Sequence, residues 1–230
     1  MRSIQELEIL IDYCFSDKHF IRLALTRRSY AIEHNEKEYN QRLEFLGDSV
    51  LGLTIAEELY KRLPNVPEGQ LTKLKAAVVC EKSLAVVANE LDIPSFIYIG
   101  KGELNLNIQH LDSTTSDTLE AIFGAVYLDS GFEVAKKLIL RLMEKQIQLS
   151  ISQINQTDSK TALQEIVQKK SKVDLEYVLV SESGPEHNKR FVSKVIHMGR
   201  TLGVGEGRTK KEAEKMAASN AIRDYAKEYK

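Results

Sequence analysis

Residues 42–51, RLEFLGDSVL, place two carboxylates in a stretch that is apolar in almost every direction. At about 100° per residue, the apolar side chains between Leu43 and Leu59 point to nearly all sides of a helix, so we expect this helix to be largely buried. Glu44 and Asp48 are separated by one helical turn and share one face. Burying an unpaired carboxylate is costly, and two on one stripe repel each other. The segment therefore predicts a positive charge between this helix and a second element.

The segment 112–129 repeats this unusual pattern. Its apolar part, TLEAIFGAVYL, contains one charged residue, Glu120, and Asp117 precedes it within one helical turn. Gly124 in this segment and Gly47 in the first would allow a neighbouring backbone to approach closely. We expect the two helices to face each other and to share a cation between their carboxylates.

Two alternatives remain open for these carboxylates. Asp117 and Glu120 have the spacing of a capping box, and Glu44 can pair with Arg42 or a distant lysine. Each helix has few other charged residues in its apolar part. A capping box on one helix together with an ion pair on the other is therefore a less favoured explanation than a shared cation.

The residue types indicate which cation such a site would take. Four carboxylates without a nearby histidine or thiolate favour a hard divalent ion, Mg²⁺ or Mn²⁺, over Zn²⁺. A di-iron bundle would need Glu-x-x-His pairs, which the sequence lacks. An acidic Mg²⁺ site suits phosphodiester hydrolysis, because the metal lowers the pKa of a water molecule and neutralises the leaving oxyanion. Spacing alone does not decide between one ion and two.

Charge divides the chain into two parts. Residues 1–152 carry 17 basic and 22 acidic residues, whereas residues 153–230 carry 15 basic and 11 acidic ones. An acidic body followed by a short basic segment predicts two modules, the second facing an anionic partner. We place domains at 1–152 and 158–230, with the polar segment 153–157 as the linker.

Cysteine usage and hydropathy indicate the compartment. Cys14 and Cys80 have neither framework nor metal-ligand spacing, so we expect buried free thiols in a reducing environment. There is no signal-peptide core and no apolar run of roughly 18 residues. These features predict a cytoplasmic protein that makes no contact with a membrane.

Periodicity predicts an all-α first domain and a small α+β second domain. The expected helices of the first domain cover residues 4–15, 18–26, 42–63, 68–79, 81–91, 112–129 and 132–151, with loops at 31–40 and 96–107. The second domain is expected to contain a helix at 161–170, strands at 175–180, 191–198 and 201–204, and a helix from Thr209, after a glycine-rich turn. Its order is α-β-β-β-α.

Lysines at the start of the last helix point to a nucleic-acid partner. Lys210, Lys211 and Lys215 cluster in its first turns, and a helix N-terminus with lysines attracts phosphate through both dipole and charge. An ordinary solvated helix face is the alternative. The α-β-β-β-α order favours a double-stranded RNA binder, with His187 as a minor-groove contact.

Over essentially its whole length the sequence resembles bacterial ribonuclease III. The resemblance is carried by RLEFLGDSVL, SDTLEAIFGAVYLDSG, TALQE, GPEHNKRF and TKKEAEKMAA. It implies an all-α endonuclease domain that forms a homodimer, followed by a double-stranded RNA-binding domain. The implied activity is Mg²⁺-dependent hydrolysis of double-stranded RNA, with Mn²⁺ as a substitute, in rRNA and mRNA processing and decay. Staggered cuts would leave 5′-phosphate and 3′-hydroxyl ends.

The resemblance also assigns roles to residues. The metal-binding carboxylates would be Glu44, Asp48, Asp117 and Glu120, of which Asp48 and Glu120 would be catalytic, and Glu68 matches an outer acidic position. The RNA-binding residues would be Thr161, Gln164, Glu165, His187, Lys210, Lys211 and Lys215. Gln41 and Lys75 stand where the family often has Glu and Arg.

Two other functions compete with the endoribonuclease. A protein that binds duplex RNA without cutting it would leave the duplex intact in the presence of Mg²⁺. A helical domain that only docks a partner would bind no metal.

Overall fold

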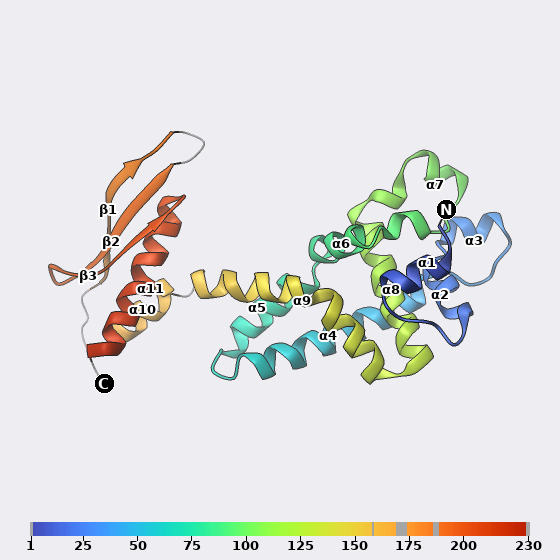
Figure 1. Ribbon diagram of the computed structural model, residues 1–230, viewed down its shortest axis with the longest axis horizontal. Coiled ribbons are helices and arrows are strands. Elements are labelled where there is room, and N and C mark those ends of the chain that lie inside the picture. The colour runs from blue at the N-terminus through green and yellow to red at the C-terminus, as the bar shows by residue number, and fades with distance from the viewer. Residues whose placement is uncertain (1, 158, 169–173, 186–188, 229–230) are drawn as a thin grey trace. The chain divides into compact units, whose positions relative to one another are not determined.

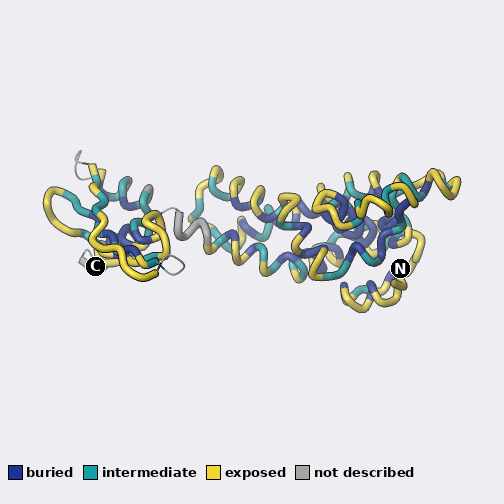
Figure 2. Tube along the Cα trace, turned by 90° about the horizontal axis from the view of Figure 1, so that it is seen from above, coloured by how far each residue is buried: buried dark blue, intermediate teal, exposed yellow. Residues whose placement is uncertain are grey.

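A computed structural model describes residues 2–157, 159–168, 174–185 and 189–228 (Figure 1). The chain divides into two compact units, Met1–Ser150 and Ile151–Lys230. In their described parts, the first is built from helices and the second from a three-stranded sheet with two helices, as the sequence predicts. Buried positions gather in each unit where its elements pack together (Figure 2).

The helices of the first unit follow one another with short connections. In chain order they are α1 (Ile4–Leu10), α2 (Lys18–Leu25), α3 (Arg28–Glu33), α4 (Gln41–Arg62), α5 (Glu68–Val79), α6 (Glu81–Glu90), α7 (Lys101–Asn105), α8 (Asp112–Ser130) and α9 (Phe132–Thr157). Two short 3-10 helices, η1 (Ile93–Phe96) and η2 (Ile108–His110), flank α7.

Helices α4 and α8 form the centre of this unit. Leu51 and Ile55 of α4 are fully buried, as are Leu119, Ile122 and Phe123 of α8. The α8 helix is buried on nearly all sides, because α2, α4 and α6 all pack against it. This explains why its sequence shows so little polar periodicity.

The structure differs from the sequence-based expectations at several connections. The first helix ends at Leu10, because the chain turns through a left-handed residue at Asp12. Residues 31–33 complete α3 rather than forming a loop, and the expected loop at 96–107 contains α7. The segment 153–157, expected to be a linker, is helical and forms the end of α9. The domain boundaries at 152 and 158 stay a prediction.

The cysteine expectation is half right. Cys14 and Cys80 are both free thiols, but both are exposed rather than buried. Cys14 lies in the connection between α1 and α2, and Cys80 lies where α5 ends and α6 begins, so an apolar neighbourhood in the sequence is not matched by burial in space.

The second unit is an antiparallel sheet in the order β1-β2-β3 with two helices on one face (Figure 1). Its strands are β1 (Glu176–Ser183), β2 (Arg190–His197) and β3 (Arg200–Gly207), and its helices are α10 (Ser159–Gln168) and α11 (Lys210–Glu228). Leu163 and Val167 of α10, Val195 of β2, and Ala217 and Ala221 of α11 form its core.

Small residues bring β3 and α11 into close contact. A Cβ atom added at Gly203 or Gly205 would lie 2.4 Å from the carbonyl oxygen or 2.2 Å from the backbone nitrogen of Ala217. Alternate glycines of a strand therefore face alanines of the helix. The expected glycine-rich turn is in fact the second half of β3, which ends at Gly207.

Candidate metal centre

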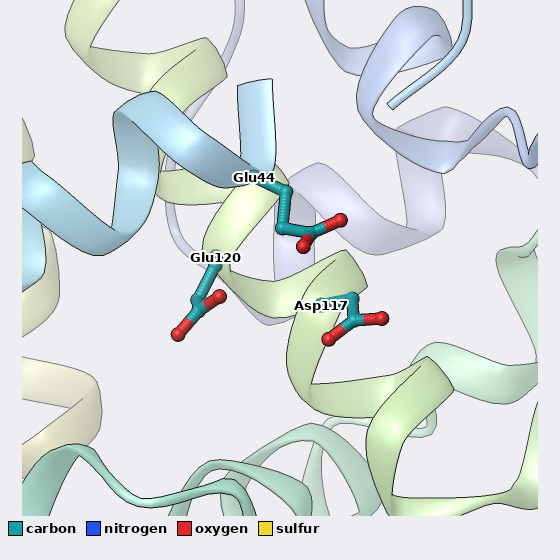
Figure 3. Close-up of side chains that lie close together, drawn as sticks. All are labelled: Glu44, Asp117 and Glu120. Carbon is teal, nitrogen blue, oxygen red and sulfur yellow. The ribbon is translucent and has the colours of Figure 1, made fainter. Parts of the chain in front are cut away.

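Three carboxylates converge where α4 crosses α8. Glu44 comes from the first turn of α4, and Asp117 and Glu120 come from neighbouring turns of α8 (Figure 3). One ligand oxygen from each residue lies within 4.8 Å of the others. All three side chains are half-buried. The two apolar helices thus bring their acidic residues together, as the sequence predicts.

Two glycines permit this crossing. A Cβ atom at Gly47 would lie 1.8 Å from the carbonyl oxygen of Glu120, and one at Gly124 would lie 2.3 Å from the carbonyl oxygen of Leu43. Real Cβ contacts do not reach such distances, so only glycine fits at these two positions. The backbones of α4 and α8 are in direct contact at Glu120 and next to Glu44. The close approach fixes the spacing between Glu44 and the two acidic residues of α8.

The alternative explanations of these carboxylates do not hold. The α8 helix begins at Asp112, so Asp117 and Glu120 lie inside the helix and do not cap its start. In the described part of the chain, no ion pair joins Glu44 to Arg42 or to a lysine.

The acidic residues oppose one another's ionisation. Burial, reinforced by the negative charge of Asp117, raises the pKa of Glu44. Burial also raises the pKa of Asp117. The pKa of Glu120 rises to about 8, because burial is joined by the charges of Asp48, Asp117 and Glu44. Such a cluster is poorly solvated and mutually repulsive, which makes it a favourable place for a divalent cation.

Family models match both units. A Ribonuclease-III-like model matches residues 17–147, and a double-stranded RNA binding motif matches residues 159–225. The chain belongs to the ribonuclease III family. At this level its function is that of an endoribonuclease acting on double-stranded RNA.

Curated relatives and a solved structure agree with this assignment. Ribonuclease 3 of Symbiobacterium thermophilum is 46% identical over 92% of this chain and 90% of its own length. Ribonuclease 3 of Caldanaerobacter subterraneus subsp. tengcongensis is 46% identical over 94% of this chain and 95% of its own. The nuclease domain of Campylobacter jejuni ribonuclease III, with a region involved in dimer formation, superposes with a TM-score of 0.60. The two sequences are 44% identical, and the superposition covers 63% of this chain and 98% of the Campylobacter jejuni chain.

Other acidic residues expected at the ribonuclease III site lie outside the three-carboxylate group. Asp48 is exposed, although its charge reaches Glu120. Glu68 is exposed at the start of α5 and accepts a hydrogen bond of 2.9 Å from the Thr72 hydroxyl. Gln41, where the family often has Glu, is exposed at the start of α4. Lys75 places its amino group against α4, 3.4 Å from where a Cβ atom of Gly52 would lie.

Sequence reasoning missed Arg27, which adds a positive charge to this region. Its Nε donates a hydrogen bond of 3.0 Å to Oε2 of Glu103, and its charge opposes the rise in the pKa of both Glu44 and Asp117. No spacing rule connects Arg27 with these residues, because they come from three separate segments.

Those of the expected RNA-binding residues that belong to described elements lie on the two helices of the second unit. Lys210 and Lys211 are exposed at the start of α11, which Thr209 caps by accepting a 3.1 Å hydrogen bond from the Glu212 amide. Lys215 is half-buried and lines a pocket together with Ser159 of α10.

The remaining expected contacts are described only in part. Gln164 of α10 donates a 3.3 Å hydrogen bond to Asp174. Thr161 and Glu165 belong to α10, but their side chains, like the whole of His187, lie outside the described residues.

Proposed function

We propose that this chain is a Mg²⁺-dependent endoribonuclease that makes staggered cuts in double-stranded RNA and leaves 5′-phosphate and 3′-hydroxyl ends. The observation that carries the proposal is the convergence of Glu44, Asp117 and Glu120 within 4.8 Å. The family assignment and a match to an RNA-binding motif supply the substrate class.

The donor set fits a hard divalent cation. Each of the three residues offers a carboxylate oxygen, and the group contains neither histidine nor cysteine. Oxygen ligands of this kind suit Mg²⁺, with Mn²⁺ as a substitute. Asp48 is exposed, and its charge acts on Glu120, so we assign it to the same site with Glu120 as the second catalytic carboxylate.

Hydrolysis breaks the bond between phosphorus and the 3′-oxygen and forms a new bond to the water oxygen. The proton released by water compensates the 3′-alkoxide, which leaves as a hydroxyl group, and the phosphate stays on the 5′ end. When bound, the metal lowers the pKa of the water and neutralises the leaving oxygen. The four carboxylates hold the cation and orient the attacking water relative to the phosphate.

The second unit is proposed to hold the duplex. Lys210 and Lys211 are exposed at the N-terminus of α11, where dipole and charge both attract phosphate. We assign Thr161, Gln164, Glu165, His187 and Lys215 to the same interface by resemblance.

The proposed setting is rRNA and mRNA processing and decay in the cytoplasm. None of the described helices has the length and apolar character needed to cross a membrane.

An exposed apolar stripe on α4 supports a homodimer. Phe45, Leu53 and Tyr60 are 77%, 59% and 73% exposed, although the sequence favours a buried helix. At 100° per residue they fall within one side of the helix. A groove of about 780 Å³ beside Phe45, lined also by Phe20 and Leu128, offers apolar surface to a second copy.

Light scattering tests this dimer. We expect wild-type protein to have the mass of two chains and Phe45→Ala to shift toward one. Ile9→Ala is the control, since Ile9 is 78% exposed on α1 of the same unit and should not affect the mass. A monomeric wild type would disprove the proposed assembly.

The activity is tested on duplex RNA with Mg²⁺, with and without EDTA. Glu120→Gln should reduce cleavage by at least about 10³-fold, because it removes a charge that holds the cation. Glu133→Gln, the same change at an exposed site on α9, should leave the rate unchanged. Full activity of Glu120→Gln would refute the mechanism, and intact duplex bound by wild type would favour the non-cleaving alternative.

A further inference from the structure

The carboxylate of Asp129 joins the end of α8 to the chain that leads into α2. Its Oδ1 accepts a hydrogen bond of 2.9 Å from the Asp17 amide, and its Oδ2 accepts one of 3.0 Å from the Ser16 amide. The Tyr13 hydroxyl donates to the same Oδ2 at 2.5 Å and lies 2.6 Å from the Ser130 hydroxyl. One side chain of α8 thus binds three donors that lie 112 to 116 residues earlier in the chain.

The place of Asp129 in its own helix indicates that these contacts are its role. Asp129 lies in the last turn of α8, which ends at Ser130, and the helix dipole disfavours a negative charge there. At the start of α2 the same carboxylate meets backbone N–H groups, where the dipole favours it. Asp17 is the N-cap of α2 and accepts a 2.8 Å hydrogen bond from the His19 amide. Asp129 therefore holds the cap of another helix.

The two helices that Asp129 joins are walls of the apolar groove of about 780 Å³ that the proposed dimer uses. His19 and Phe20 of α2 line this groove, and so does Leu128, the residue before Asp129 in α8. The Phe20 amide donates to the Asp17 carbonyl at 3.3 Å, so one helical turn links the bound cap to the groove wall. The shape of the groove therefore depends on where Asp129 holds the start of α2.

The connection between α1 and α2 is attached to the rest of the unit at a second point. Phe15 is buried, and its amide donates to Oε1 of Glu8 in α1 at 2.7 Å. The Lys18 amino group donates to the same oxygen at 2.5 Å. In the described part of the chain, every hydrogen bond from residues 13–17 to α8 ends on Asp129 or Ser130. Removing the Asp129 contacts should thus shift α2 against α8 without unfolding the connection.

We propose that Asp129 is a positioning residue of the dimer interface, which fixes α2 against α8 and thereby shapes the groove that receives a second copy of the chain. The inference rests on the proposed homodimer. It assigns a role to a half-buried residue that is not itself among those lining the groove.

Subunit exchange between unlabelled and isotope-labelled full-length chains, followed by native mass spectrometry, tests this role. Asp129→Asn should exchange at least about ten-fold faster than wild type, up to loss of the dimer. In either orientation the new amide group points an N–H group at a backbone N–H donor of Ser16 or Asp17. Cooperative thermal unfolding should be retained, because Glu8 still holds the connection.

Asp92→Asn is the matched control. The Asp92 carboxylate accepts hydrogen bonds of 3.1 Å from Arg2 and 2.8 Å from the Ser95 hydroxyl, and Asp92 is not among the residues that line the groove. The variant loses charged contacts in the same unit, so its exchange rate should stay within about two-fold of wild type.

A double-mutant cycle with Phe20→Leu separates positioning from a general loss of stability. If Asp129 acts through α2, Asp129→Asn should accelerate exchange by only about three-fold or less when Phe20 has already been replaced. General destabilisation would give the same acceleration in both backgrounds. That result, or equal exchange rates of Asp129→Asn and wild type, would overturn the inference alone. A monomeric wild type would overturn the homodimer and the inference together.

Discussion

Glu120 is a side chain whose ionisation in the folded chain costs stability. Its pKa is raised to about 8, by burial and then by Asp48, Asp117 and Glu44. The folded chain therefore binds a proton at this position over a pH range in which the unfolded chain does not. Its contribution to stability is largest at low pH and is lost as pH rises from about 4.5 to about 8.

Replacing Glu120 with Gln should remove this pH dependence. Above pH 8 and without divalent cations, we expect the free energy of unfolding of Glu120→Gln to exceed that of wild type by about 1–2 kcal/mol after solvent screening. The variant should therefore unfold at a higher temperature. Below about pH 5 this electrostatic advantage should vanish, because wild-type Glu120 is then protonated. Thermal unfolding in EDTA at both pH values measures the effect. A difference that stays constant with pH would contradict the assigned cause.

The carboxylate group could be predicted from the sequence because local spacing defines most of it. Asp117 and Glu120 share a face of α8, and the apolar surroundings of Glu44 indicate that α4 must pack against another helix. Arg27 could not be predicted in this way. Its position depends on the pairing of its backbone with Tyr98 and on the location of Glu103 in α7.

Secondary-structure elements likewise divide into those that local sequence patterns predict and those that depend on tertiary contacts or are too short to show a pattern. The helix at 68–79 was predicted at its observed bounds, because Pro67 marks its start and its apolar periodicity is clear. The α7 helix was missed, since five residues bounded by Gly100 give no measurable period. The β3 strand was predicted too short because its glycines suggest a turn. They are compatible with a strand here since each faces the closely packed α11.

Contact between α4 and α8 predicts a large difference between two glycines of one helix. Gly47→Ala should destabilise the protein by about 3 kcal/mol or more, because its Cβ atom would clash with the backbone of Glu120. Gly52→Ala should be neutral or stabilising by up to about 1 kcal/mol, since it gains helix propensity and meets only the flexible end of Lys75. Urea unfolding measures both. Equal midpoints for the two variants would show that the helices do not approach this closely.

At the scale of the whole molecule, the two units divide the work between holding duplex RNA and cutting it. The charge distribution follows this division, with a net charge of −5 on residues 1–152 and +4 on residues 153–230. An acidic unit repels the RNA backbone, so we expect its carboxylates to need a cation and a separate basic unit to engage a phosphate. Binding and cleavage should therefore be separable by mutation.

Lys211→Gln should weaken binding of duplex RNA and lower the dependence of log Kd on log salt by about one, because one phosphate contact is lost. Lys194→Gln is its control. Lys194 follows Ser193 and precedes the core residue Val195 in β2, so it lies on the sheet face away from α10 and α11. Electrophoretic titrations in EDTA at several salt concentrations measure these affinities. Equal salt slopes for both variants would exclude the start of α11 from the interface.

Cleavage by Lys211→Gln and by Glu120→Gln then distinguishes the two units. Lowering the salt concentration should restore cleavage by Lys211→Gln, because tighter electrostatic binding compensates for the missing contact. It should not restore cleavage by Glu120→Gln, whose duplex affinity is expected to match wild type while its site lacks a carboxylate. Initial rates at low and high salt, with Mg²⁺ constant, measure this difference. Recovery of both variants at low salt would mean that Glu120 contributes to binding the duplex and not to the cleavage step.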